Sequence, residues 1–105
     1  MDVTATAYEI PLVAAPQTLT VRLGSLNYGM RLIYRGVAGW VLDLSDALGN
    51  VLVAGIPLVT GADLLAPYPN LAIGGALYVQ TDGDPAAVPG FADLGDPSRL
   101  FFVTP

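Results

Sequence analysis

Glycine and proline interrupt this chain so often that little room remains for a long helix. The sequence holds twelve glycines and nine prolines, and they fall between short apolar runs. Both residues disfavour helix interiors, and short runs separated by turn residues are typical of all-β folds. We therefore expect an all-β fold, a small antiparallel β-sandwich or barrel of about six or seven short strands with at most one short helix.

Alternation of apolar and polar residues predicts three strands in the first half. Leu19, Val21 and Leu23 alternate with threonine and arginine. In the next two predicted strands, the residues on one face are Tyr28, Met30, Leu32 and Tyr34, then Trp40, Leu42 and Leu44. Turn-forming residues at 24–27 and 35–39 separate these strands, and those at 46–50 close a second hairpin after the third strand. The pattern predicts an antiparallel meander.

The middle of the chain is harder to assign by alternation. Residues 51–57 are nearly all apolar, which predicts a strand covered on both faces that lies centrally or at an interface. Residues 60–65 are the one place where a helical turn is expected, with Thr60 as the N-cap and Asp63 reaching back to its amide.

Extended structure is expected again towards the end of the chain. Residues 71–81 contain Gly74 and Gly75, a pair that predicts a bulge or a close backbone approach within a strand. A long loop over residues 86–97 then leads to a last, aromatic strand over residues 99–103.

Composition excludes several classes of function. A chain of 105 residues is expected to form one domain, residues 1–105, with one core. Its formal charge is −5 and it has no lysine, so we expect no direct binding of nucleic acid, which needs clustered basic residues. Histidine and cysteine are both absent, which removes the usual general base and the usual metal and thiol chemistry. We expect no enzyme activity and no cofactor.

The apolar content exceeds what one small core can hide. The chain is 53% hydrophobic and only 12% charged. No apolar run reaches the roughly 20 residues that span a membrane, and the first residues do not form a signal peptide, so no membrane partner is expected. The excess surface is therefore expected to be covered by other protein chains.

The aspartates near residues 82–96 are the nearest approach to a metal site. Asp82, Asp84, Asp93 and Asp96 offer oxygen ligands, but their spacing does not match a calcium-binding loop. Aspartate and glycine also form turns without a metal. We predict turns and no metal site.

Catalytic motifs are also missing from the sequence. No two carboxylates are paired by the predicted strands in the way that a glycosidase requires. Ser25, Ser45 and Ser98 lack a histidine partner and the nucleophile-elbow motif. The glycines at 24–29 and 74–75 do not have the spacing of phosphate-binding loops. We expect no catalytic residue.

Two segments are expected to contact neighbouring subunits. Residues 51–59 and 99–103 are apolar at consecutive positions, so each presents two hydrophobic faces, and one core can hide only one of them. The predicted interface residues are Val51, Val53, Ile56, Leu58, Val59, Leu100, Phe101, Phe102 and Val103.

The order of several short motifs adds a family resemblance. In the second half they are Gly55-Ile56-Pro57-Leu58-Val59-Thr60-Gly61, Asp63-Leu64-Leu65, Tyr68, Ile73-Gly74-Gly75, Leu77-Tyr78-Val79, Thr81-Asp82-Gly83-Asp84-Pro85, Leu94-Gly95 and Leu100-Phe101-Phe102-Val103. In the first half they are Ile10-Pro11-Leu12, Pro16-Gln17, Arg31-Leu32, Trp40 and Leu42-Asp43. With these motifs the chain resembles the small baseplate plug proteins of contractile-tailed bacteriophages, from a myophage or a prophage tail.

The resemblance implies a structural role without chemistry. It implies a virion tail baseplate subunit, made in the bacterial host cytoplasm, that closes the end of the tail tube. It also implies several copies around the tail axis, packed against tube and hub or spike proteins. The alternative hypothesis is a small non-catalytic carbohydrate- or peptide-binding β-sandwich module that uses Trp40 or a tyrosine as its platform.

Overall fold

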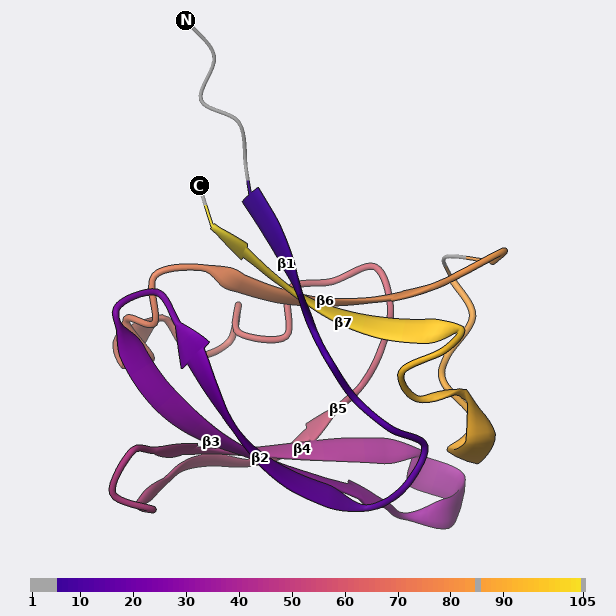
Figure 1. The fold of residues 1–105 in the computed structure, drawn as a ribbon, viewed down its shortest axis with the longest axis horizontal. Helices are drawn as coiled ribbons and strands as arrows, with labels where there is room; N and C mark the ends of the chain where they lie inside the picture. Colours follow the sequence, from indigo (N-terminus) through magenta and orange to yellow (C-terminus); the bar gives the residue numbers. More distant parts are fainter. Residues whose placement is uncertain (1–5, 85, 105) are drawn as a thin grey trace, which may run out of the picture.

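The computed structural model describes residues 6–84 and 86–104, which form two antiparallel sheets that face each other (Figure 1). One sheet has the strand order β2-β3-β4-β5 and the other has the order β1-β7-β6. The strands are β1 (Thr6–Ile10), β2 (Gln17–Leu23), β3 (Leu26–Tyr34), β4 (Trp40–Asp46), β5 (Val51–Pro57), β6 (Ala76–Thr81) and β7 (Ser98–Thr104). Three single 3-10 turns are η1 (Gly36–Ala38), η2 (Pro69–Leu71) and η3 (Phe91–Asp93). The expected all-β fold with seven short strands is confirmed.

The four-stranded sheet is the predicted meander extended by one strand. Met30 lies opposite Leu19 on β2 and opposite Leu44 on β4. Residues that are directly opposite each other on antiparallel strands face the same side of a sheet. Met30, Leu32, Leu42 and Leu44 therefore share the inner face, where all four are fully buried. On the outer face, Arg31 lies 3.6 Å from Asp43, and Ile33 lies opposite Val41.

The last strand of the chain occupies the centre of the smaller sheet. β7 pairs with β1 on one side and with β6 on the other, so the two ends of the described chain lie side by side (Figure 1). Its inward residues Leu100 and Phe102 are buried. At the start of the strand, the hydroxyls of Ser98 and Thr81 form a buried hydrogen bond of 2.8 Å.

The sequence predicts that residues 51–57 lie centrally or at an interface; the central position is wrong, because β5 lies at the edge of its sheet, and the interface stays a prediction. Its pairing with β4 changes register on both sides of Leu44. Gly55 takes a positive φ of 80°, and its N–H donates to the Asp43 carboxylate at 2.8 Å. This irregular strand buries Ile56 but leaves Val51 exposed. A run of apolar residues does not reveal such a register change, because the change depends on a partner 12 residues away.

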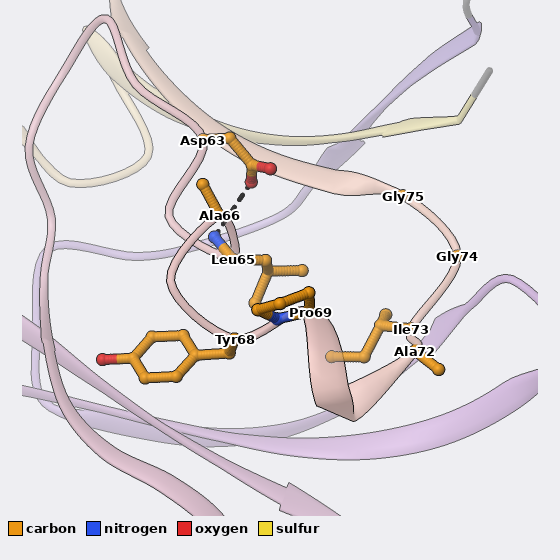
Figure 2. Close-up of a pocket in the computed structure, with 9 residues that line it drawn as sticks. All are labelled: Asp63, Leu65, Ala66, Tyr68, Pro69, Ala72, Ile73, Gly74 and Gly75. Atoms are coloured by element: carbon orange, nitrogen blue, oxygen red, sulfur yellow. Dashed lines mark hydrogen bonds between the residues drawn. The ribbon is translucent and has the colours of Figure 1, made fainter.

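The predicted helical turn at residues 60–65 is also wrong, and a loop forms there instead. The Thr60 hydroxyl donates to the Ala86 carbonyl at 2.8 Å and does not cap a helix. The Asp63 carboxylate accepts hydrogen bonds from the backbone N–H groups of Leu65 at 2.9 Å and Leu77 at 3.1 Å (Figure 2 shows the first). Asp63 therefore ties the loop to β6, and such side-chain bonds compete with helix formation.

The glycine pair at 74–75 lies just before β6 and not in the middle of a strand, because extended structure begins only at Ala76. A Cβ atom on Gly75 would lie 2.6 Å from Cζ of Phe102 and 2.7 Å from the carbonyl oxygen of Val103. The predicted close approach of backbone is thus confirmed. The space that a side chain would take at Gly75 is filled by the ring of Phe102.

Gly95 provides a test of close packing between the 86–97 loop and the segment after β1. Its φ is 93°, and a Cβ atom there would overlap the Leu12 carbonyl oxygen. Gly83 has a similar φ of 83° but nothing within 4 Å of such an atom. We expect Gly95→Ala to lower the free energy of unfolding by roughly 2–4 kcal/mol and Gly83→Ala by roughly 1–2 kcal/mol. Urea denaturation measures both, and equal losses would contradict the close approach.

Asp46 provides a test of the β4–β5 hairpin. Its carboxylate accepts hydrogen bonds from the N–H groups of Leu48 and Asn50, both at 2.9 Å, and from the Asn50 side chain at 3.1 Å. These bonds, chiefly that from the Asn50 backbone, hold the pKa of Asp46 below its usual value. A lowered pKa means that the carboxylate stabilises the fold above about pH 4, and that this contribution is lost as the pH falls through the folded-state pKa.

We therefore expect Asp46→Asn to melt several degrees below the parent at neutral pH, and the difference to vanish in strong acid. Thermal melts at both pH values measure it. Asp84→Asn is the control, because Asp84 accepts one longer bond, from the Ala86 N–H at 3.2 Å. A difference that persists in acid would show that the charge of Asp46 is unimportant.

Candidate subunit interface

The nine residues predicted for the interface divide between the core and the surface. Four of them are buried inside the subunit, namely Ile56, Leu58, Leu100 and Phe102. Val53, Phe101 and Val103 are partly exposed, whereas Val51 and Val59 are exposed. The interface itself stays a prediction. Only the five exposed or partly exposed residues have side-chain surface that a partner could contact.

The two faces of β7 explain why adjacent phenylalanines differ. Successive residues of a strand point to opposite sides of the sheet. Phe102 points inward, where it is 3% exposed and lies opposite Leu77 of β6. Phe101 points outward and lies opposite Tyr78 of β6. A second environment for one of the two rings was predicted from the sequence, and the outer face of the sheet provides it.

Phe101 belongs to an apolar surface that we name the outer patch, made of Tyr78, Phe101 and Val103. With Gly61, Val79 and Gln80, these residues line a shallow depression of about 290 Å³. Tyr78 is 37% exposed and was absent from the predicted interface. Its position opposite Phe101 depends on the pairing of β6 with β7, which no local pattern reveals.

A cluster of charged residues borders the outer patch. Arg99, two residues before Phe101 on the same outer face, contacts three carboxylates. Its Nε lies 2.9 Å from Asp82, its Nη1 lies 3.1 Å from Glu9, and its Nη2 lies 3.6 Å from Asp96. These contacts, first with Asp82 and then with Glu9, raise the pKa of Arg99 above its usual value. One positive charge thus faces three negative ones.

Charge is distributed unequally between the two layers. The three-stranded layer with its connections, residues 6–16, 58–84 and 86–104, contains six carboxylates and one arginine. The four-stranded layer, residues 17–57, contains three arginines and two aspartates. The acidic character of the chain is therefore concentrated in the layer that carries the outer patch.

The aromatic cluster around Trp40 is not an exposed platform. Trp40 is 1% exposed, and its indole N–H donates to the Gly90 carbonyl at 3.1 Å. Its ring stacks on Phe91 at a centroid distance of 5.6 Å and meets Tyr34 edge-on at 5.4 Å. Since a carbohydrate platform needs an open ring face, Trp40 does not serve as one. Tyr34 and Tyr78 remain partly exposed, and Tyr8 is exposed.

The aspartates of residues 82–93 have structural partners within the subunit. Asp82 pairs with Arg99, Asp84 accepts a hydrogen bond from Ala86, and Asp93 accepts one from the Gly90 N–H at 2.9 Å. Across residues 6–84 and 86–104, no three acidic side chains come together as a cation site. The same part of the chain contains no helix that is long and apolar enough to cross a membrane.

Comparison with known proteins identifies the family. A family model described as the cyanophage baseplate Pam3 plug gp18 matches residues 7–105. The chain belongs to this family. No curated protein matches it. Membership in the baseplate plug family makes the chain a structural component of a phage tail baseplate, which places it in the virion tail together with other tail proteins.

The two faces of β7 in this plug-family protein lead to a prediction about its stability. Phe102→Ala empties part of the core and should lower the free energy of unfolding by about 3–5 kcal/mol. Phe101→Ala removes a half-buried ring from the surface and should cost about 1 kcal/mol. Urea denaturation of both purified variants tests this. Equal losses would mean that both rings lie in the core.

Proposed function

We propose that this chain is the plug subunit that closes the end of the tail tube and is displaced when the sheath contracts. Several copies surround the tail axis and pack against tube and hub or spike proteins. The observation that carries the proposal is the family match over residues 7–105. The chain acts by contact alone, without a catalytic residue, a cofactor, a membrane or direct nucleic-acid binding. It is made in the host cytoplasm before it joins the baseplate.

The arrangement of surfaces supports this role. The outer patch exposes apolar side chains of β7, which pairs on both sides, and of its neighbour β6. Val51 and Val59 add apolar surface elsewhere. Surfaces of this kind mark contacts between proteins. The alternative of a carbohydrate-binding module loses its first candidate platform, because Trp40 is buried.

Removing the gene from the phage or prophage that encodes it tests the proposal. We expect tails whose tube end lacks plug density in electron-microscopic averages, with baseplates that are incomplete or unstable. Supplying the parent chain in trans should restore the density, and the core variant Phe102→Ala should restore less of it because less folded protein is available.

Tails that lack the gene product but show a closed tube end and a complete baseplate would contradict the proposal. The proposal would also be contradicted if tails purified from the parent phage or prophage did not contain this chain. Mass spectrometry of purified tails measures its presence independently of the images.

A further inference from the structure

We propose that the outer patch binds a different tail protein, at a surface whose apolar centre is bordered by lysine or arginine. This inference rests on the proposed function. It adds the chemistry of the partner and the face of this chain that binds the partner. The observation behind it is the combination of an apolar depression with an acidic border on one layer of the sandwich.

The centre of the site is hydrophobic and supported from below. Tyr78, Phe101 and Val103 lie on two paired strands, with Tyr78 opposite Phe101. Their inward neighbours Leu77 and Phe102 are buried in the core. The patch is therefore a preformed surface, and its burial would contribute through the area removed from water.

The carboxylates at the border of the site are accessible to a partner. The side chain of Asp96 is 83% exposed, that of Asp82 is 54% exposed and that of Glu9 is 40% exposed. All three share Arg99 as their cation. Charge-assisted hydrogen bonds from lysine or arginine of a partner would use the exposed oxygens. Complementary charge of this kind steers association and selects the partner.

A second copy of the chain fits this face poorly. Two copies meeting through the same patch would bring two acidic borders together, and like charges in contact oppose association. The other layer of a second copy offers Arg22, Arg31 and Arg35. Arg22 donates to the Gly24 carbonyl at 3.3 Å, Arg31 lies 3.6 Å from Asp43, and Arg35 lies in the turn after β3. The neighbours of Arg31 on the outer face of β2 are Thr18 and Thr20, which are exposed and do not match an apolar centre. Copies around the tail axis would then touch through other surfaces.

Photo-crosslinking in assembled tails tests the inference. A benzophenone amino acid replaces Tyr78 in one variant and Thr20 in a matched control, which is also exposed but lies on the outer face of the other sheet. After irradiation, mass spectrometry identifies the joined peptides. We expect the Tyr78 position to join to another tail protein at a segment that contains lysine or arginine, and the Thr20 position not to join to that segment.

Charge reversal tests the border separately. Asp96→Lys should reduce the Tyr78 crosslink by roughly tenfold, because it places a positive charge against basic partner groups. Thr20→Lys, which adds a lysine to the other layer, should leave the crosslink unchanged. Thermal melting of the purified variants shows that each is folded, and Asp96→Asn serves as a milder variant that should weaken the crosslink less.

Three results would overturn the inference alone. They are a Tyr78 crosslink to a second copy of this chain, no Tyr78 crosslink in tails that contain the chain, and a crosslink that Asp96→Lys leaves at full yield. A chain that is absent from the tails would overturn the proposed function and this inference together. Detecting the chain in purified tails therefore distinguishes failure of this inference from failure of the proposed function.

Discussion

One layer of apolar side chains between two sheets is the constraint on which the remaining structure depends. The chain has room for a single core, and strands can deliver only every second residue to it. β7 supplies Leu100 and Phe102 from the centre of one sheet, while Met30 and Leu42 are buried on the inner face of the other. Phe101, on the opposite face of β7, must then remain at the surface or meet another protein. The outer patch is a direct consequence of this alternation.

The connections do more than join strands, because they close the ends of the core. The loop after β5 is held by Asp63, which binds two backbone N–H groups, and by Thr60, which reaches the loop after β6. At another corner, Trp40 is covered by Phe91 and bonded to Gly90. Long-range polar bonds thus replace the helices that a chain rich in glycine and proline does not form easily.

The separation of charge between layers connects the fold to assembly. Within the described residues, carboxylates collect on the layer that carries the outer patch, and Arg99 neutralises only part of them. A subunit that exposes apolar surface gains selectivity from such a border, since charge at the rim of an interface disfavours wrong partners more than it adds affinity. For a baseplate plug, which packs among many tail proteins, this selectivity is useful.

The sequence by itself determined the fold class, the strands with alternating residues and the absence of histidine and cysteine, because these depend on composition and on a period of two. Its motif order also pointed to the plug family. The tertiary structure alone decided that β5 lies at an edge, that residues 60–65 form a loop and that Tyr78 joins Phe101 on one surface. These features depend on which strands pair and which distant groups exchange hydrogen bonds. Residues such as Phe101 and Phe102 look equivalent in the sequence, and only the placement of β7 between two neighbours assigns one to the core and the other to the surface.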